Sequence, residues 1–508
     1  MKLDKQKPVS GQLGGFIKEL RRQKGLTQAQ FAKLLETSQS AVARIERGGQ
    51  NLTTKEIVKI GRVLNRNIID LSGSLDFEVT GGHKLSGHIK TNYSKNGSVS
   101  LLCASLLNRG KTILHGIARI EEVYRLIEVL ESLGVAVKWT DVNTVEIQPP
   151  VELNWSRFNN QAAAKTRSAL MLVGSLLSWT NDFCLPHAGG CKMGERTITA
   201  HKLGLAGLGV KIKTTENEYR VSYKKLKDRA DIVMYEAGDT AVNNILLAAA
   251  TRLGPTIIRF APANYQVQEL CFFLNKLGVK IEGIGTTTLV VYGRTDDVKQ
   301  TLEYTNSEDP IESMMFITTA AITGSELKIT RCPLDFLRLE LFKLKLMGLK
   351  FSLSKEYLAE NGRTILTDIK VKPSKLKALS DKIHALPYPG INVDNLPFFV
   401  PLATQAAGTT LIHDWMWENR AIYFTELNRL GAQVKLADPH RVFINGPTKL
   451  TSAQVVCPPA LRPAVIILIA MLAADGVSVL RNVYSINRGY EEIAERLNSI
   501  GAKIKVLS

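Results

Sequence analysis

The feature that most constrains the fold is a short motif that occurs six times after residue 130. In each copy a helix-like segment ends in a hydrophobic residue, a glycine follows, and a strand-like alternation of apolar and polar residues begins. A glycine there is typical of a helix C-terminus, because the backbone turns left-handed at that point. The six copies contain Gly134, Gly209, Gly278, Gly348, Gly431 and Gly501. The chain after residue 76 is therefore predicted to consist of six related units.

Each unit also contains a helix that is apolar on nearly all sides. A helix without a polar face has to be buried on all sides. The predicted buried helices span residues 98–107, 169–177, 242–250, 314–322, 398–406 and 465–473. Six units of a buried helix, an outer helix and strands predict an α/β chain of two closed globules with three units each, because a solenoid would leave its ends exposed.

The chain of 508 residues has a net charge of +18, and much of this charge lies near the N-terminus. Residues 1–75 contain 14 Lys and Arg against 6 Asp and Glu, which is a net charge of +8. A basic segment of domain size is typical of proteins that bind nucleic acid. Solvated lysines on a helical face would give the same count, so charge alone leaves both interpretations open.

The pattern of residues 10–73 predicts a small all-α domain. A first helix ends at Gly25, and Thr27 then has the position of an N-cap, with Gln30 at the capping-box position. Further helices are predicted over residues 28–35, 38–48, 53–64 and 68–71. Two short helices joined by a tight turn are the helix-turn-helix arrangement, whose second helix enters the major groove of DNA.

Two segments of this domain, at residues 25–32 and 38–48, resemble the Cro and phage-repressor family of DNA-binding domains. The resemblance implies that DNA is a partner and that the chain binds it as a homodimer. It implies DNA-contacting roles for Gln28, Gln39, Ser40 and Arg44. Glutamine and arginine suit such roles because they present paired hydrogen-bonding groups to purines. A helical module that contacts another protein remains the alternative.

Other features of the sequence exclude several classes of protein. No apolar run approaches the roughly 20 residues that span a bilayer, and the first ten residues contain no apolar signal segment. The six cysteines stand singly, without a CxxC pair, so neither a zinc site nor a disulfide framework is expected. We expect a soluble cytoplasmic protein with reduced thiols, no membrane partner, no metal and no cofactor.

Two segments carry residue types that suit chemistry on anions. Cys191 stands in a glycine-rich loop at residues 187–196 with basic residues nearby, and this electropositive setting favours a reactive thiolate. Lys95 and Asn96 precede the first buried helix, where backbone N–H groups and a lysine together suit an anion. A small buried thiol and a capping turn with a solvated lysine are the alternatives.

Together with the repeat, these segments resemble the enolpyruvyltransferase family, and within it the UDP-N-acetylglucosamine 1-carboxyvinyltransferase type. The resemblance implies a domain at residues 77–508 with two inside-out α/β lobes, built from six βαβαββ-like units. One lobe would comprise residues 97–303 and the other residues 77–96 with 304–508. The implied reaction transfers the enolpyruvyl group of phosphoenolpyruvate to a hydroxyl of UDP-N-acetylglucosamine or a related nucleotide, in a cleft between the lobes.

The resemblance also implies a role for each candidate residue. Cys191 would protonate the phosphoenolpyruvate methylene, Lys95 would bind the phosphate, and Asn96 would bind the sugar. Asp309 would be the base for the acceptor hydroxyl, and Asp394 would lie across the cleft from the Cys191 loop. Either aspartate would also suit a helix N-cap. The cations that hold phosphate and carboxylate would include Arg167, Arg196 and Arg420.

The chain departs from the family where the family holds the nucleotide. The family segment Pro-Val-Asp-Leu-His is replaced by Thr-Ile-Thr-Ala-His at residues 197–201. Ser-Val-Gly-Ala-Thr is replaced by Glu-Ala-Gly-Asp-Thr at 236–240, and Arg-Glu-Pro-Glu by Ala-Asn-Tyr-Gln at 263–266. Carboxylates near a diphosphate would repel it unless they turn away or pair.

Three functions therefore stay open. The first is transfer to UDP-N-acetylglucosamine by an enzyme with a fused DNA-binding domain. The second is the same transfer to a different nucleotide acceptor. The third is a transcription regulator in which the enolpyruvyltransferase portion has become a ligand sensor. The retained thiol and carboxylates favour catalysis, because a sensor needs neither.

Overall fold

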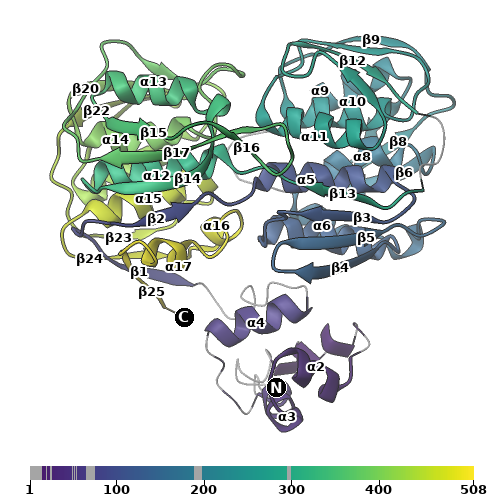
Figure 1. Cartoon of the computed structure of the whole chain (residues 1–508), viewed down its shortest axis with the longest axis horizontal. Helices are drawn as coiled ribbons and strands as arrows, with labels where there is room; N and C mark the ends of the chain where they lie inside the picture. Colours follow the sequence, from purple (N-terminus) through teal and green to yellow (C-terminus); the bar gives the residue numbers. More distant parts are fainter. Residues whose placement is uncertain are drawn as a thin grey trace, which may run out of the picture. The chain divides into compact units, whose positions relative to one another are not determined.

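The computed structural model describes residues 14–15, 17–18, 20–22, 24, 26–48, 50, 52, 54–64, 75–187, 197–294 and 299–507. The chain divides into two compact units. The first unit is Met1–Phe77 with Arg481–Tyr484 and Val506–Ser508, and the second is Glu78–Leu480 with Ser485–Lys505. The helices and strands of both units are labelled in Figure 1.

The described residues of the first unit between 14 and 64 are mainly helical. It includes α2 (Gln28–Leu34), α3 (Gln39–Glu46) and α4 (Thr54–Leu64). Apolar side chains from all three helices form one buried cluster, which includes Phe31, Val42, Ile45, Ile60 and Leu64. The helix predicted at residues 68–71 lies outside the described residues.

Side-chain caps fix the starts of α2 and α3. The Gln30 amide N–H donates to Thr27 Oγ1 at 3.2 Å, and the Thr27 amide N–H donates to Gln30 Oε1 at 2.8 Å. The Ala41 amide N–H donates to Ser38 Oγ at 3.2 Å. These bonds satisfy amide groups that a helix start otherwise leaves without an acceptor. The predicted capping box at Thr27 is confirmed.

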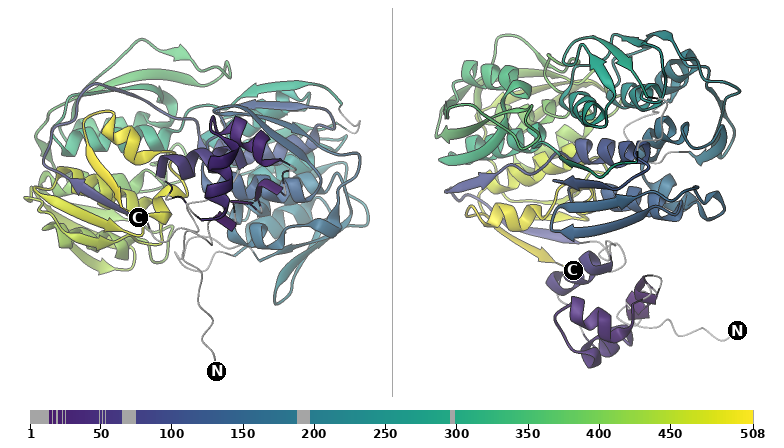
Figure 2. Two further views of the ribbon diagram at one scale, coloured as in Figure 1. Left: turned by 90° about the horizontal axis from the view of Figure 1, so that it is seen from below. Right: turned by 45° about the vertical axis from the view of Figure 1, so that its right-hand side comes forward.

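The second unit has two lobes, each with three β-sheets among its described residues (Figures 1 and 2). The strands of the first lobe are β3 (Thr112–His115), β4 (Ala136–Asp141), β5 (Thr144–Gln148), β6 (Asp182–Pro186), β7 (Lys211–Thr214), β8 (Glu218–Ser222), β9 (Ala230–Val233), β10 (Thr256–Arg259), β11 (Lys280–Glu282), β12 (Thr288–Tyr292) and β13 (Leu302–Thr305). They form sheets with the strand orders β13-β3-β5-β4, β6-β8-β7 and β11-β12-β10-β9.

The second lobe repeats this plan with strands from both ends of the unit. They are β1 (Asp76–Thr80), β2 (His88–Lys90), β14 (Leu327–Pro333), β15 (Lys350–Leu353), β16 (Tyr357–Leu358), β17 (Ile365–Lys372), β18 (Leu376–Lys377), β19 (Ile383–His384), β20 (Ala406–His413), β21 (Gln433–Asp438), β22 (Arg441–Gly446), β23 (Gln454–Val456), β24 (Val477–Arg481) and β25 (Lys503–Leu507). Their sheets have the orders β23-β24-β1-β25, β15-β17-β14-β2 and β18-β20-β22-β21. Strand β16 also pairs with β17, and β19 with β20.

Three mutually packed helices form the interior of each lobe. In the first lobe they are α5 (Lys95–Ala104), α8 (Leu172–Leu176), which continues η4 (Arg167–Met171), and α10 (Asp239–Ala249). In the second lobe they are α12 (Pro310–Ile322), α14 (Phe399–Thr404), which continues η6 (Leu396–Phe398), and α15 (Leu461–Ala473). Every residue of α12 is buried. The six buried helices predicted from the sequence are confirmed.

Outer helices and strands cover these interior helices. The outer helices of the first lobe are α6 (Glu121–Ser132), α7 (Asn160–Lys165), α9 (Thr199–Gly207) and α11 (Tyr265–Lys276). Those of the second lobe include α13 (Arg338–Leu346), η7 (Ala421–Leu430), α16 (Tyr484–Asn487) and α17 (Ile493–Asn498). The glycines of the six motifs, which follow outer helices, all have a φ between 84° and 100°. The predicted left-handed helix ends are therefore confirmed.

The chain crosses between the lobes twice. Strand β2 pairs with β14 of the second lobe, with Ile89 beside Ile329, and the chain then enters α5 of the first lobe. It returns after β13, which pairs with β3. The Ser94 amide N–H donates to the Ser307 carbonyl at 2.7 Å, so the two crossing segments contact each other. In the part of the chain that the structure describes, no helix has the length and apolar character of a membrane span.

Candidate functional site

Charged residues stand at the N-terminal ends of the six buried helices. Each lies in the first turn of its helix or within two residues before it: Lys95, Arg167, Asp239, Asp309, Asp394 and Arg462. Residues from both lobes influence one another electrostatically. Lys95 of the first lobe and Arg462 of the second both lower the pKa of Asp394, whereas Asp394 raises that of Asp239. The helix ends of the two lobes therefore define one candidate site.

Lys95 is a fixed cation at the start of α5. Its Nζ lies 2.6 Å from Glu122 Oε2 and donates to Asn96 Oδ1 at 3.1 Å. The Ser168 hydroxyl donates to Glu122 as well. Burial alone would raise the pKa of Glu122, but the Lys95 ammonium and the Ser168 hydrogen bond outweigh it, and the pKa falls to about 2. Glu122 thus stays ionised and holds the ammonium where an anion could reach it.

Asp394 lies between two arginines. Arg462 Nη2 donates to Asp394 Oδ2 at 3.2 Å, and Arg420 Nη1 lies 3.9 Å from Asp394 Oδ1. Burial alone would raise the pKa of Asp394, but the two arginines and Lys95 hold it below its ordinary value. The side chain is still 28% exposed. An ionised carboxylate is therefore accessible to a molecule in the site.

Arg420 is held by a buried carboxylate. Its Nε donates to Asp414 Oδ2 at 2.5 Å, and its Nη2 donates to Asp414 Oδ1 at 2.8 Å and to the Val393 carbonyl at 2.7 Å. The Arg420 side chain is 1% exposed. Its guanidinium is thus fixed beside Asp394 by groups of the same lobe.

Asp309 caps α12 with one carboxylate oxygen and contacts the start of α5 with the other. Oδ1 accepts from the Ile311 amide N–H at 2.8 Å, and Oδ2 accepts from the Lys95 amide N–H at 3.3 Å. Burial raises its pKa, although Arg462 opposes this shift. Asp309 therefore links the start of α12 to the start of α5, across the two lobes.

Arg167 lies beside residues of two segments that depart from the resemblance, 197–201 and 236–240. Its Nη2 donates to the Thr197 carbonyl at 2.9 Å. Burial lowers its pKa, and the nearby Tyr219 and Glu236 oppose this shift. The predicted site residues Cys191 and Arg196 lie outside the described residues, so their roles remain predictions.

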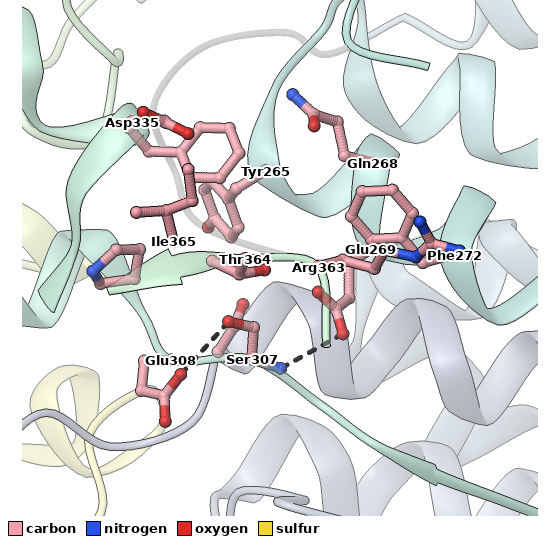
Figure 3. Close-up of a pocket in the computed structure, with 13 residues that line it drawn as sticks. Tyr265, Gln268, Glu269, Phe272, Ser307, Glu308, Asp335, Arg363, Thr364 and Ile365 are labelled. Carbon is pink, nitrogen blue, oxygen red and sulfur yellow. Dashed lines mark hydrogen bonds between the residues drawn. The ribbon is translucent and has the colours of Figure 1, made fainter. Parts of the chain in front are cut away.

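Asn96 contacts a tyrosine that the sequence did not single out as a contact of the site. Asn96 Nδ2 donates to the Tyr265 hydroxyl at 2.9 Å. The Tyr265 ring also lines a pocket, partly open to solvent, between α11 and the second lobe (Figure 3). Glu269 in that pocket accepts from the Tyr304 hydroxyl at 2.9 Å, and burial raises its pKa to about 8. This pocket adjoins the candidate site through Tyr265.

The predicted DNA-contacting residues lie in α2 and α3. Gln39, Ser40 and Arg44 of α3 are exposed. Gln28 is half-buried, and its Nε2 donates to Glu46 Oε2 at 2.8 Å. Glu46 in turn accepts from the buried Arg21. Gln28 thus contacts α3 itself, while the other three side chains reach solvent.

Comparison with known proteins identifies the two parts of the chain. The family described as EPSP synthase (3-phosphoshikimate 1-carboxyvinyltransferase) matches residues 79–497. The chain belongs to this family. Within this member of the EPSP synthase family, residues 17–71 match the helix-turn-helix family and form an N-terminal helix-turn-helix domain.

Two curated relatives of this EPSP synthase family member share one name. The UDP-N-acetylglucosamine 1-carboxyvinyltransferase of Treponema denticola is 35% identical over 437 residues, which are 85% of this chain and 99% of the relative. That of Bradyrhizobium diazoefficiens is 33% identical over 440 residues, which are 85% of this chain and 98% of the relative.

Solved structures share the fold. The enolpyruvyl transferase NikO of Streptomyces tendae matches with a TM-score of 0.75 and 22% identity, over 86% of this chain and 99% of that one. The EPSP synthase of Acinetobacter baumannii matches with a TM-score of 0.66 and 19% identity, over 86% of this chain and 100% of that one. The predicted architecture of two lobes preceded by a helix-turn-helix domain is confirmed.

Sequence reasoning missed several charged residues of the site in this EPSP synthase family member. Arg462 donates to Asp394 and, through Nη1, to the Tyr490 hydroxyl at 2.7 Å. Arg488 lies near enough to Glu122 to lower its pKa, although its segment was predicted to be structural. A signal existed for Arg462, since it is a charge in the first turn of an otherwise apolar helix.

Proposed function

We propose that the chain transfers the enolpyruvyl group of phosphoenolpyruvate to a hydroxyl of UDP-N-acetylglucosamine and releases phosphate. In a bacterial cell this reaction would supply a peptidoglycan precursor. The observation that carries the proposal is the group of Lys95, Asp394 and Arg462, which brings two cations and an accessible carboxylate together from both lobes.

The cations suit the anionic donor. Phosphoenolpyruvate carries a phosphate and a carboxylate, and fixed cations at a converging set of helix N-termini bind such groups well. Lys95 is already oriented by Glu122, and Arg462 by Asp394 and Tyr490. Arg167, and Arg196 outside the described residues, would complete the set, whereas Arg420 is 1% exposed and paired with Asp414 and would act by holding its own segment beside Asp394.

The geometry favours Asp394 over Asp309 as the base. Asp309 is only 7% exposed, and its two oxygens accept backbone N–H groups at the starts of α12 and α5, so an acceptor hydroxyl reaches it less easily than Asp394. Asp394 is partly exposed and ionised, so it can take the proton of the acceptor hydroxyl. Asp309 would then serve to position Lys95, because it accepts from the amide N–H of that residue.

The proposed reaction has two steps. The acceptor oxygen forms a bond to C2 of phosphoenolpyruvate and gives its proton to Asp394, while the Cys191 thiol protonates the C3 methylene. The C2–O bond to phosphate then breaks, and the departing phosphate takes the proton held by Asp394. C3 returns a proton to the thiolate, which restores the double bond. Hydrogen bonds from Lys95 and the arginines stabilise the charge on the departing phosphate.

A phosphate-release assay with phosphoenolpyruvate and UDP-N-acetylglucosamine tests this proposal. We expect Cys191→Ala to lose at least 100-fold in rate, the lower end of the contribution of general acid catalysis. Cys184→Ala is the matched control, because Cys184 lies in β6 and has no part in the proposed chemistry. Equal rates for wild type and Cys191→Ala would contradict the proposal and favour the ligand sensor.

The N-terminal domain is proposed to bind DNA through α3. Gln39, Ser40 and Arg44 are exposed on one short helix that follows a tight turn, as in a recognition helix. Gln28 would act indirectly, since it is bonded to Glu46 at the end of that helix. Binding as a homodimer and a location in the cytoplasm, where phosphoenolpyruvate and DNA are both present, are parts of this proposal.

Anisotropy titrations with a duplex selected from a random pool test the DNA proposal. Each phosphate that the domain neutralises should steepen the salt dependence of log Kd by about 0.9. Arg44→Ala should lose discrimination between the selected duplex and a scrambled one by at least fivefold. A flat salt response would favour a module for protein contact.

A second acceptor remains a candidate because of one observation. Asp239 of the altered segment at 236–240 accepts hydrogen bonds from Asn264 and Gln266 of the altered segment at 263–266. Two segments that depart from the resemblance are therefore joined through one carboxylate, which favours a different nucleotide acceptor.

A further inference from the structure

Positive charge beyond residue 75 is concentrated in one segment. Without the 14 Lys and Arg and the 6 Asp and Glu of residues 1–75, the chain has 51 Lys and Arg and 41 Asp and Glu, a net charge of +10. Residues 343–377 contain 9 Lys and Arg against 3 Asp and Glu, which is a net charge of +6. These 35 residues therefore hold more than half of the excess charge.

Lysines of this segment lie on the solvent-exposed face of one sheet in the second lobe. Strands β15, β17 and β14 are neighbours in this order (Figure 1). Lys350 lies directly opposite Lys372, and Lys370 lies directly opposite Lys328, so the members of each pair share a face. Lys370 and Lys372 are two residues apart in β17, so both pairs point to the same side. All four side chains are exposed.

Two more lysines flank this face at one end. The Lys377 amide N–H donates to the Met347 carbonyl at 2.9 Å, and the Lys350 amide N–H donates to Ser374 Oγ at 2.8 Å. These bonds hold the exposed Lys375 and Lys377 beside the start of β15. We call the whole surface the lysine face, and it comprises Lys328, Lys350, Lys370, Lys372, Lys375 and Lys377.

Few acidic side chains balance the charge of the lysine face. Lys328 Nζ lies 2.8 Å from an Asp368 carboxylate oxygen, and Lys370 Nζ lies 2.6 Å from a Glu326 carboxylate oxygen. The other four lysines form no ion pair with any residue that the structure describes. Lys350 and Lys372 are like charges directly opposite each other, an arrangement that destabilises a sheet. An anion bound between them would remove this repulsion.

The composition of the lysine face favours DNA over a membrane as the anionic partner. Helices that bind a membrane surface insert apolar side chains beside their basic ones. The exposed side chains next to Lys370 and Lys328 on this face are instead polar, namely Ser352 and His88. A DNA duplex has one negative charge per about 1.7 Å of its axis, so a face of three strands, about 10 Å across, meets several phosphates.

A second DNA contact would strengthen the binding of a chain that already includes a helix-turn-helix domain. Once one surface of a chain binds a duplex, another surface of the same chain meets that duplex at a high effective concentration. Lysine contacts to phosphates also add affinity without sequence preference, because sequence is read at the base edges. A lysine face therefore complements a recognition helix.

Building on the proposed DNA binding by the N-terminal domain, we propose that the lysine face is a second, sequence-independent DNA-binding surface. Its lysines would contact phosphates, while base recognition stays with α3. The proposed enolpyruvyl transfer involves none of these six lysines. DNA affinity and phosphate release should therefore respond separately to mutation of the lysine face.

The salt dependence of DNA binding by the full chain tests this proposal. The triple variant Lys350→Gln with Lys372→Gln and Lys375→Gln removes three charges from the lysine face. Each lost phosphate contact lowers the slope of log Kd against log salt by about 0.9, so three contacts lower it by about 2.7. At about 0.1 M salt the affinity should fall at least tenfold, and by the same factor for the selected and the scrambled duplex. Phosphate release should equal that of wild type.

A second triple variant controls for net charge. Lys111→Gln with Lys280→Gln and Lys449→Gln also removes three charges, but each of these lysines is paired with an acidic side chain outside the lysine face. Its slope should differ from that of wild type by less than one phosphate contact, about 0.9. If the first triple variant does not fold, Lys375→Gln with Lys377→Gln should still lower the slope by about 1.8.

Three results would overturn the inference. The first is an equal slope for wild type and the lysine-face variants. The second is a changed ratio of Kd between the selected and the scrambled duplex in those variants, since phosphate contacts carry no sequence preference. The third is binding to vesicles of anionic phospholipid that the variants lose while their DNA slope stays unchanged, which would assign the face to a membrane. A wild type that binds neither duplex would instead overturn the proposed DNA binding by the N-terminal domain.

Discussion

Replacing Asp414 by Asn should destabilise the second lobe severely. Asp414 and Arg420 form a bidentate ion pair with hydrogen bonds of 2.5 Å and 2.8 Å. Their side chains are 0% and 1% exposed. Two unit charges about 3 Å apart attract by roughly 5 kcal/mol at an effective dielectric constant of about 20. Removing one partner leaves the other charge buried without compensation, which costs about 3–5 kcal/mol.

This loss is large enough to measure in the intact chain. One kcal/mol corresponds to about 2–4 °C in Tm for a domain of about 200 residues. Differential scanning calorimetry should therefore show a fall of about 6–20 °C for Asp414→Asn in the transition of this lobe. The double variant Asp414→Leu with Arg420→Met should fall much less, because it leaves neither charge unpaired.

The matched control is a surface pair with the same geometry. Arg220 donates to both oxygens of Asp182 at 3.2 Å and 2.7 Å, but these side chains are 57% and 48% exposed. Solvent screens such a pair, so Asp182→Asn should leave Tm unchanged within error. Equal falls in Tm for Asp182→Asn and Asp414→Asn would refute this reasoning. A fall for Asp414→Asn no larger than that for Asp414→Leu with Arg420→Met would refute it as well.

Three further predictions concern other positions. Glu122 has a pKa of about 2 in the fold, against an ordinary value of 4.5. Its contribution to the stability of the fold should therefore be complete above pH 4.5 and be lost as the pH falls toward 2. In Glu122→Gln, Tm should depend less on pH in that range. Burial lowers the pKa of His201 from 6.5 to about 4, so protonation should destabilise the fold as the pH falls through that range, and His201→Gln should flatten this dependence. Thr27→Ala removes the capping-box hydroxyl and should cost the N-terminal domain about 1 kcal/mol in urea unfolding, without affecting the transition of the second unit.

Local patterns predicted the fold because local physics decides those features. The left-handed turn at Gly134 and the buried character of α12 follow from short stretches of sequence, and both are confirmed. The capping box at Thr27 needs residues only three positions apart, and it too is confirmed. The helix-turn-helix domain and the six-unit architecture were accessible for the same reason.

Pairings between distant segments were not accessible in the same way. Arg462 was not predicted at the site, because its partner Asp394 lies 68 residues earlier in the chain. The sequence marked Asp239 as a departure from the family, yet its amide partners lie about 25 residues away and on another helix. Such contacts depend on how the helix ends of different units meet, and the spacing of residues within a short stretch of sequence does not predict this.

The most direct test of the proposed chemistry is the rate of phosphate release from phosphoenolpyruvate with UDP-N-acetylglucosamine and with other nucleotide acceptors. Wild type should release phosphate with at least one acceptor, and Cys191→Ala and Asp394→Asn should each be at least 100-fold slower with that acceptor. The product should be the enolpyruvyl ether of the acceptor by mass spectrometry. If wild type is no faster than Cys191→Ala with every acceptor, the chain is not an enolpyruvyltransferase for this class of substrate.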